Sequence, residues 1–437
     1  MDNLFTSEKV LPAIIKMCIP VVISMLVVVA YNMVDLFFVS LTNDSYQIAA
    51  VSLANPVFML LMAVGSLAGG GGTVSIARSL GAKEDDKSKA YSSLCAWSMI
   101  IIGCCIMAFI LIKTDWILSF VGADSSTWAY TSEYIRILGL GSIFIIFSSG
   151  YANLIRSEGA VKVAMISNLL STIVNLTFDP IFILLLHWGV KGAAMATVMG
   201  NIFGCIYLLY YIKTKSSLSI SIKDIHLSFK DGIYMFYLGF PNATSNLVSS
   251  INNTIQNQIL VVYGATTIAA FGVASKIQLI VSMICLGMGM GIQPLLAYNV
   301  GAKNTKRINE IIKTSILISL FITIIAGLGC IVFKEQFARI FFSDTEMISL
   351  VSKIVTIQMI SCPLYGLIYI TINYLQSCKK ATLSTILSIA RQGWLLIPFS
   401  IIMNKIWGLN GFFFSTVIAD LLTSIICLIL LLKNRPK

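Results

Sequence analysis

The feature that most restricts the fold of this chain is an internal repeat, in which the second half echoes the first at a constant offset of 220 residues. Four matches define it: Ile48-Ala-Ala-Val51 with Ile268-Ala-Ala-Phe271, Gly81-Ala-Lys83 with Gly301-Ala-Lys303, Asn153 and Ser157 with Asn373 and Ser377, and, one residue out of step, Trp188-Gly-Val-Lys-Gly192 with Trp407-Gly-Leu-Asn-Gly411. Two of these matches lie at predicted loops, where shared hydrophobicity would not produce them. In an apolar chain, duplicated halves predict a pseudo-symmetric membrane protein with its working site between or within the halves.

Long apolar segments indicate that the chain spans a membrane. It is 57% hydrophobic and 11% charged, with a mean hydropathy of +0.89, whereas soluble domains carry about 25% charged residues. The segments are long enough to cross a hydrocarbon core about 30 Å thick. We predict an all-α integral membrane fold with twelve transmembrane helices, at residues 11–39, 47–76, 90–112, 128–155, 162–186, 191–212, 233–262, 268–299, 310–332, 347–377, 381–404 and 408–432.

The distribution of basic residues orients these spans. The net charge is +11. With the N-terminus placed in the cytoplasm, the flanking segments put 20 Lys and Arg residues on the cytoplasmic side and 5 outside, as the positive-inside rule requires. The even number of spans returns the C-terminus to the cytoplasm. The basic charge thus orients the protein, and we expect no nucleic-acid partner.

The longest hydrophilic stretch, between spans 6 and 7, divides the repeats. We predict an N-terminal six-helix lobe at residues 1–212, a cytoplasmic linker at 213–232 and a C-terminal six-helix lobe at 233–437. Because six spans precede the linker, both lobes have the same orientation. They should therefore be related by an axis along the membrane normal.

The most informative residues are carboxylates inside the spans, because a charge at mid-bilayer costs at least about 2.5 kcal/mol. Asp35 lies in span 1, with Asn32 on the same helix face, and Asp179 in span 5 lies one turn after Asn175. Thr197 in span 6 adds a hydroxyl. This oxygen-rich set suits Na⁺ or a shared proton. The alternative is structural pairing between helices, yet no Lys or Arg lies nearby in these spans to neutralise two carboxylates.

Further polar residues mark the second half. Span 7 carries a stripe at helical spacing that faces either a wet cavity or neighbouring helices: Asn242, Ser245, Ser249, Asn253 and Gln256. Lys276, Arg391 and Asp420 are the remaining charges expected to be buried. An internal ion pair involving Asp420 is the first interpretation, and a second coupling site is the other.

Several functional classes find no support in the sequence. The glycine runs Gly69 to Gly72 and Gly287, Gly289 and Gly291 have no preceding strand and no following Gly-Lys-Ser/Thr, so they predict close helix contacts rather than a nucleotide loop. The ten cysteines form no CxxC pair, which argues against structural zinc. We find no catalytic constellation and expect neither an enzyme nor a bound cofactor.

These residues together resemble the multidrug and toxic compound extrusion (MATE) transporters over essentially the whole chain. The resemblance is carried by Asp35, by Gly81-Ala-Lys83 and its repeat, by Arg156-Ser-Glu-Gly159 leading into Asn175-xxx-Asp179, and by Gly192-Ala-Ala-Met-Ala-Thr197. It implies two six-helix bundles forming a V around a central cavity, and drug export driven by entry of H⁺ or Na⁺. It also implies a cation site at Asp35, Asn175, Asp179 and Thr197.

Some members of that family carry acidic residues in spans 7 and 8, where this chain has Gln256 and Lys276. The chain thus resembles the branch coupled through the N-terminal lobe. We assign the coupling ion, H⁺ or Na⁺, to Asp35, Asn175, Asp179 and Thr197 with Asn32 beside them. We assign the substrate cavity to a second set of residues: Tyr31, Asn153, Asn242, Ser249, Asn253 and Gln256.

The function predicted from the sequence is secondary active multidrug efflux. The expected partners are small-molecule drugs or toxic organic cations and the lipids of a bacterial cytoplasmic membrane, with the chain acting as a monomer. The alternative is a flippase for lipid-linked saccharides of the same superfamily. Such proteins often have cationic cavities for pyrophosphate, and Lys276 and Arg391 would suit one.

Overall fold

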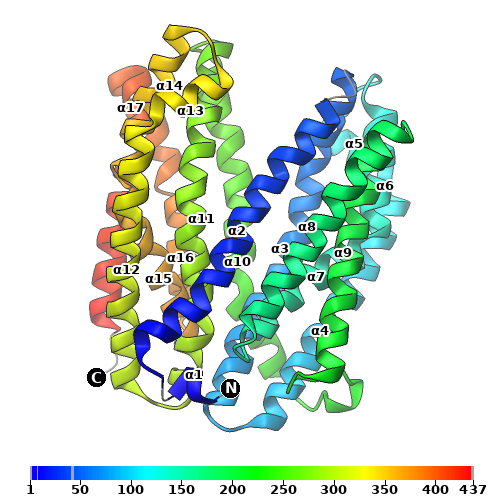
Figure 1. Ribbon diagram of the computed structural model, residues 1–437, viewed down its shortest axis with the longest axis vertical. Helices are drawn as coiled ribbons and strands as arrows, with labels where there is room; N and C mark the ends of the chain where they lie inside the picture. Colours follow the sequence, from blue (N-terminus) through cyan, green and yellow to red (C-terminus); the bar gives the residue numbers. More distant parts are fainter. Residues whose placement is uncertain (1, 7, 41–43, 435–437) are drawn as a thin grey trace. The chain divides into compact units, whose positions relative to one another are not determined.

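The computed structural model describes residues 2–6, 8–40 and 44–434, and only the backbone at residues 2, 3, 32, 33, 35–37, 39, 40 and 45. Every regular element in this part of the chain is a helix (Figure 1). The α-helices are α1 (Asp2–Thr6), α2 (Val10–Ser40), α3 (Ser45–Gly81), α4 (Asp85–Ile112), α5 (Thr114–Val121), α6 (Trp128–Leu140), α7 (Ser142–Arg156), α8 (Val161–Pro180), α9 (Gly189–Thr214), α10 (Phe229–Val261), α11 (Ala265–Gly301), α12 (Thr305–Val332), α13 (Lys334–Phe341), α14 (Thr345–Met359), α15 (Tyr365–Ser377), α16 (Ala381–Gln392) and α17 (Leu396–Lys433). A π-helix, η1 (Ile181–Leu185), and two 3₁₀ turns, η2 (Ile222–Asp224) and η3 (Cys362–Leu364), complete the list.

The helices account for all twelve predicted spans and confirm the all-α membrane fold. Within the described residues, nine helical segments are long and apolar enough to cross a membrane, and the bent pair α6 and α7 makes a tenth. The segment Ala381–Lys433 contains spans 11 and 12, because α17 continues past a break at Gly408, where φ is 58°. The polar stripe lowers the hydropathy of α10, which supplies the remaining span.

Backbone conformation repeats along with the sequence. Lys83 and Lys303 both adopt the left-handed region, with φ of 61° and 56°. Gly189 and Gly408, which follow the repeated tryptophans, have φ of 53° and 58°. A non-glycine residue rarely adopts positive φ. Its recurrence at matched positions therefore indicates that the two halves fold in the same way locally.

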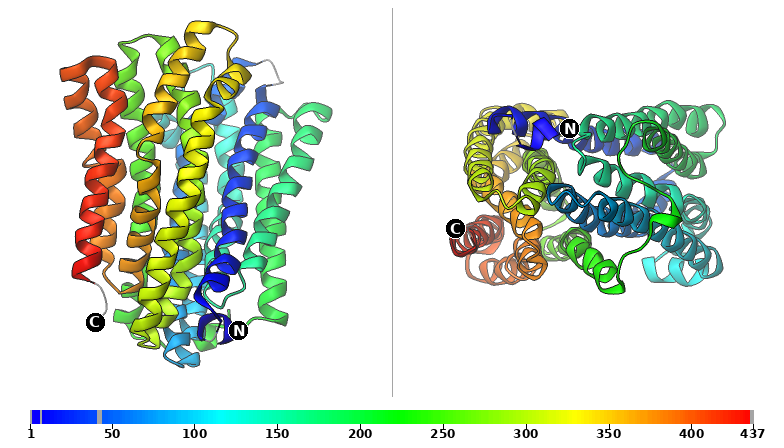
Figure 2. Two further views of the ribbon diagram at one scale, coloured as in Figure 1. Left: turned by 60° about the vertical axis from the view of Figure 1, so that its left-hand side comes forward. Right: turned by 90° about the horizontal axis from the view of Figure 1, so that it is seen from below.

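The helices form two compact units. The N-terminal unit is Ile23–Ala243, and the C-terminal unit is Asp2–Val22 with Thr244–Lys437. Helices α2 and α10 are therefore each divided between the units. This division follows packing, whereas the predicted lobes follow the repeat and remain a prediction. Within the C-terminal unit, α15, α16 and α17 run side by side, and α1 lies at the same end as the end of α17 (Figure 2).

The glycine runs allow close helix contacts, as predicted. A Cβ atom at Gly71 in α3 would lie 1.9 Å from the carbonyl oxygen of Met235 in α10, inside the N-terminal unit. The repeat-related Gly291 in α11 faces the first half of α2, where a Cβ would lie 2.8 Å from Cα of Cys18, inside the C-terminal unit. Only glycine permits backbones to approach this closely.

The segment between α9 and α10 is bound to the N-terminal unit. Glu158 is buried, and its carboxylate accepts hydrogen bonds from the hydroxyls of Ser216 and Ser217 at 2.9 Å. The hydroxyls of Ser92 and Ser93 in α4 donate to the carbonyl of Ser219 at 2.8 and 3.0 Å. This linker is therefore attached to the unit that precedes it.

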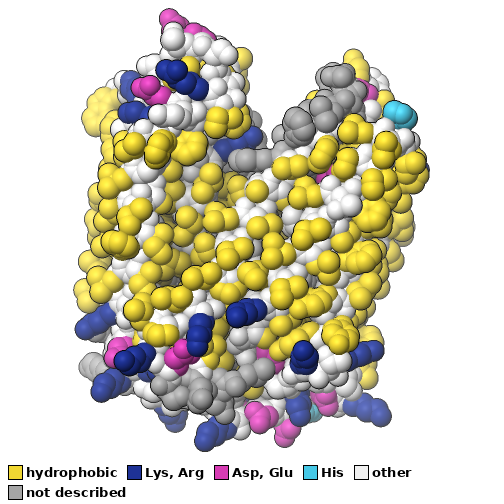
Figure 3. All heavy atoms as spheres, in the orientation of Figure 1, with side chains coloured by type: hydrophobic (Ala, Val, Ile, Leu, Met, Phe, Trp, Pro, Cys, Tyr) yellow, Lys and Arg dark blue, Asp and Glu magenta, His cyan; other side chains and the backbone are white. Residues whose placement is uncertain are grey.

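Exposed apolar side chains cover the long helices. On the face seen in Figure 3, hydrophobic side chains cover the sides of the helices, and Lys and Arg gather towards the helix ends. Leu317, Phe321 and Ile325 of α12, which are 66%, 67% and 54% exposed, exemplify this surface. Such an extended apolar surface fits contact with lipid rather than water.

Candidate ion and substrate sites

The N-terminal unit holds a buried polar cluster on two adjacent helices, which we call the N-site: Asn175 and Asp179 of α8 and Thr197 of α9. The spacing of four residues puts Asn175 and Asp179 on one face of α8. All three side chains are buried, and Asp179 is 0% exposed. The Asn175 amide donates to the Thr197 hydroxyl at 3.3 Å. Three residues predicted from the sequence thus lie together.

Two features of the N-site suit an ion. Within the described residues, Asn175 Oδ1 has no hydrogen-bond partner, although it is buried, and leaving such an oxygen unpaired costs about 1–3 kcal/mol. Tyr31 of α2, predicted to line the substrate cavity, has its hydroxyl 3.4 Å from the Thr197 hydroxyl. Oxygen atoms of a carboxylate, an amide and hydroxyls are ligands that a hard cation prefers.

Asn32 and Asp35, the other two predicted ion ligands, lie in α2. Their side chains are outside the described residues. Their assignment to the ion site therefore stays a prediction.

A π-helical turn follows the N-site directly and was not expected from the sequence. The turn η1 begins after Pro180, and the amide of Leu186 donates to the carbonyl of Ile181, five residues earlier, at 2.9 Å. Proline lacks an N–H and crowds the preceding turn of a helix, so Pro180 was the available signal. π-Helical turns occur frequently at functional sites. Here the turn changes the helix register just beyond Asp179.

The other predicted substrate residues lie in different surroundings. In the N-terminal unit, half-buried Asn153 accepts a hydrogen bond from Arg156 at 2.8 Å, and Asn242 packs against Gly70. In the C-terminal unit, Ser249 is half-buried, Asn253 is exposed and Gln256 is buried. The predicted stripe on α10 thus divides into exposed and buried positions.

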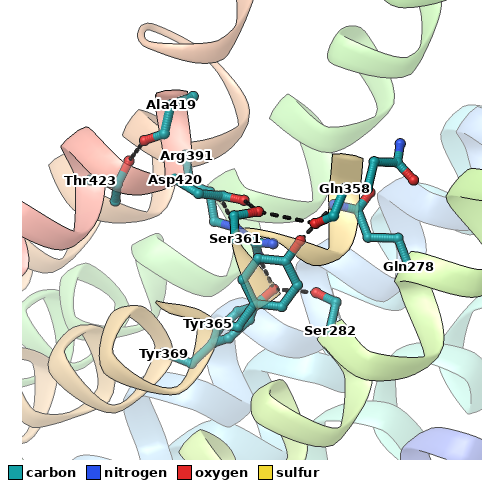
Figure 4. Close-up of polar contacts among 10 residues, drawn as sticks. All are labelled: Gln278, Ser282, Gln358, Ser361, Tyr365, Tyr369, Arg391, Ala419, Asp420 and Thr423. Atoms are coloured by element: carbon teal, nitrogen blue, oxygen red, sulfur yellow. Dashed lines mark hydrogen bonds and ion pairs between the residues drawn. The ribbon is translucent and has the colours of Figure 1, made fainter. Parts of the chain in front are cut away.

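The C-terminal unit holds a second polar cluster, which we call the C-site (Figure 4). Arg391 of α16 and Asp420 of α17 form an ion pair with Nε and Oδ1 2.9 Å apart. This confirms the predicted internal pair at Asp420. Lys276 of α11 was wrongly expected to be buried: its side chain is exposed, whereas the adjacent Ile277 occupies the buried face of the helix.

Uncharged side chains complete the C-site. The Ser361 hydroxyl donates to Asp420 Oδ2 at 2.7 Å, and Arg391 Nη1 donates to the Tyr369 hydroxyl at 2.6 Å. The guanidinium lies over the Tyr365 ring, 4.2 Å from its centroid. The sequence analysis did not predict these three partners, Ser361, Tyr365 and Tyr369. The spacing of four residues between the two tyrosines was the available signal.

Among the described residues, no three His, Cys, Asp or Glu side chains come together. A structural zinc site was not expected from the sequence, and any ion at the N-site would be held by oxygen atoms alone.

Comparison with known proteins agrees with this architecture. The MatE family model matches residues 20–181 and 241–402, one match in each repeat. The chain is 30% identical to the multidrug export protein MepA of Staphylococcus haemolyticus (strain JCSC1435) over 434 residues, 99% of this chain and 96% of that protein.

Solved structures give the same result. An outward-facing multidrug resistance MATE transporter of the MOP superfamily has a TM-score of 0.91 at 25% identity, covering 98% of this chain and 96% of that one. A MATE protein in its straight conformation has a TM-score of 0.92 at 25% identity, with the same coverage. With two family matches covering well over half of its residues, the chain belongs to the multidrug and toxic compound extrusion (MATE) family of membrane transporters.

Proposed function

We propose that this protein exports amphipathic, cationic compounds in exchange for H⁺ or Na⁺ through the N-site. The observation that carries the proposal is Asp179, a fully buried carboxylate, one helical turn from an amide oxygen that lacks a partner within the described residues. A charge in such surroundings favours uptake of a proton or a cation. The names of its staphylococcal relatives, multidrug export proteins, support the substrate class.

The proposed mechanism is an exchange between two access states. Binding of the ion at Asp35 and Asp179 stabilises one state, and binding of the drug stabilises the other, so that each ligand shifts the equilibrium by its differential affinity. Tyr31, whose hydroxyl is near Thr197, belongs to the proposed drug-contacting residues and adjoins the ion site. Ion entry can therefore alter drug contacts over a short distance.

The remaining proposed drug contacts are the other polar residues assigned to the substrate cavity from the sequence. They are Asn153 and Asn242 in the N-terminal unit, and Ser249, Asn253 and Gln256 in the C-terminal unit. Exposed Asn253 is the position from which we expect direct contact, so Asn253→Ala should change which compounds are resisted. An unchanged resistance profile would favour a helix-packing role for the stripe.

The membrane setting is part of the proposal. We infer a bacterial cytoplasmic membrane with both termini in the cytoplasm, which follows from the distribution of Lys and Arg and agrees with bacterial relatives. Labelling Lys83→Cys and Lys303→Cys from one side tests the orientation, because both residues should react from the cytoplasm. Reaction of the two positions from opposite sides would overturn it.

The flippase alternative loses support in one respect. It drew on Arg391 as a cavity cation for pyrophosphate, and Arg391 is committed to Asp420. Lys276 alone retains an exposed charge.

Transport in proteoliposomes, with proton and sodium gradients imposed separately, tests the proposal. Export of a cationic dye should follow one gradient, and Asp35→Asn should abolish this dependence. Asp86→Asn, the same change at an exposed position in the first turn of α4, is the matched control. Full gradient-driven export by Asp35→Asn would overturn the assignment of this carboxylate.

A further inference from the structure

The C-site has the composition of a cation site. Asp420 supplies a carboxylate, and Tyr365 and Tyr369 turn ring faces towards the same point, 4.2 and 5.2 Å from the carbon of the Arg391 guanidinium (Figure 4). A carboxylate and aromatic faces together attract a desolvated monovalent cation. The guanidinium of Arg391 lies where such a cation would bind.

The pocket around the guanidinium is held by contacts that do not involve Arg391. Ser361 donates to Asp420 Oδ2 at 2.7 Å, and Gln278 donates to the Tyr365 hydroxyl at 2.5 Å. The Ser282 and Tyr369 hydroxyls are 3.0 Å apart. Because these contacts fix the carboxylate and both rings, the pocket should persist when the arginine side chain is removed.

The repeat matches the helix pair α8 and α9 of the N-terminal unit with the pair α16 and α17 of the C-terminal unit, but the buried charges lie at different positions in the two pairs. At the offset of 220, Arg391 corresponds to Ser171, and at the offset of 219 that follows the deletion, Asp420 corresponds to Asn201. Conversely, the residues 220 positions after Asn175 and Asp179 are Leu395 and Phe399. Each unit therefore has a buried carboxylate on this helix pair, and in the C-terminal unit Arg391 forms an ion pair with it.

We propose that the C-site is a second monovalent cation site and that the Arg391 side chain is its permanent occupant. A guanidinium stays protonated in proteins and is covalently attached, so it cannot exchange with the solution. The carboxylate of Asp420 is thereby excluded from ion exchange. The consequence for transport rests on the proposed coupling at the N-site: of the two sites, only the N-site would exchange an ion during export.

The first test removes the occupant. In Arg391→Ala, the vacated pocket should bind small cations, so we expect the melting temperature of the purified full-length protein to rise by roughly 2–4 °C in saturating NaCl or methylguanidinium chloride relative to choline chloride. The measurement is made at about pH 8 to limit competition by protons. Tyr365, Tyr369, Cys362 and Cys285 are further titratable side chains around the ion pair.

Two variants serve as controls. The melting temperature of Arg391→Ala/Asp420→Asn should not rise in either salt, because no carboxylate remains to be neutralised. The melting temperature of Arg391→Lys should not rise either, because the lysine side chain supplies the cation. An equal response of the single and double variants, or no response of a folded Arg391→Ala protein to either salt, would overturn the proposal.

A second measurement decides the matter if Arg391→Ala does not fold. The charge-neutral variant Arg391→Ala/Asp420→Asn, reconstituted into proteoliposomes, should keep the wild-type ratio of ions to exported dye even if its rate falls. A changed ratio would mean that the pair exchanges ions and would overturn the proposal. Failure of the proposed function has a different signature, since dye export by the wild type would then follow neither gradient.

Discussion

The N-site and the C-site each hold a buried carboxylate on a matched pair of helices, but the groups around the two carboxylates differ. In the C-site, Asp420 Oδ1 is 2.9 Å from Nε of Arg391, and Oδ2 accepts a hydrogen bond from the Ser361 hydroxyl. In the N-site, Asp179 shares its helix face with an amide oxygen that has no partner among the described residues. A buried carboxylate that is neutralised by a covalently attached cation stabilises the fold. A buried carboxylate that suits an exchangeable ion can instead bind and release that ion during transport. Under the proposed function, the N-terminal half couples ion entry to export, and the ion pair of the C-terminal half has a structural role.

The largest expected effect concerns the N-site, where we propose that the ion binds. Asp179→Asn should lower gradient-driven export at least about tenfold, because loss of one ion-binding carboxylate removes 1.4 kcal/mol or more of differential binding. Dye export from proteoliposomes measures it, and Thr177→Ala, on the exposed face of α8, is the control. Normal export by Asp179→Asn at wild-type expression would move coupling away from the N-site.

Removal of the C-site carboxylate should affect stability more than transport chemistry. Asp420→Asn leaves Arg391 charged with its side chain only 11% exposed, and breaking a buried pair in this way costs about 3–5 kcal/mol. We expect a large fall in melting temperature in detergent, with partial recovery in Arg391→Gln/Asp420→Asn. If Asp420→Asn melts like the wild type, the ion pair is not a structural element.

Close helix contacts should differ between the units. Gly71→Ala brings a methyl group towards a backbone oxygen now 1.9 Å from the Cβ position, whereas in Gly291→Ala the nearest atom is 2.8 Å away. Overpacking costs about 1–3 kcal/mol, or more where backbone cannot move, so Gly71→Ala should be the more destabilised in thermal melts. Gly272→Ala, with open space at its Cβ, is the control. Equal melting temperatures for the two variants would contradict this order.

The smallest expected effect concerns matched loop residues. Asp124 accepts hydrogen bonds from the Thr127 hydroxyl and amide at 2.8 and 2.9 Å, and these bonds hold its pKa below the usual range. Its repeat mate Asp344 accepts one from the amide of Glu346 at 3.2 Å. Asp124→Asn should therefore lower the melting temperature slightly more than Asp344→Asn.

The pH dependence follows from the sign of the shift at Asp124. A lowered folded-state pKa contributes stability that is present above the unfolded value of about 3.9 and is lost as the pH falls through the folded value. The difference in melting temperature between the wild type and Asp124→Asn should be largest near neutral pH and shrink below about pH 4. A difference that grows on acidification would contradict this account.

The sequence by itself determined the membrane class, the twelve spans and the repeat, because each follows from local hydrophobicity and residue identity. The conformations of Lys83 and Lys303, and of Gly189 and Gly408, agree with the repeat down to backbone angles. The i, i+4 spacing likewise predicted the shared face of Asn175 and Asp179, since helix geometry fixes it. The ion pair at Asp420 was foreseen because a buried charge needs a partner.

Tertiary structure decided which groups meet across helices. The placement of Arg391 over Tyr365 and Tyr369, the exposure of Lys276 and the attachment of the linker through Glu158 depend on helix rotation and loop path. Residues far apart in the sequence meet only where close packing fixes those rotations. Likewise, Pro180 signalled a break, but only packing decided that the chain continues as a π-helical turn beyond Asp179.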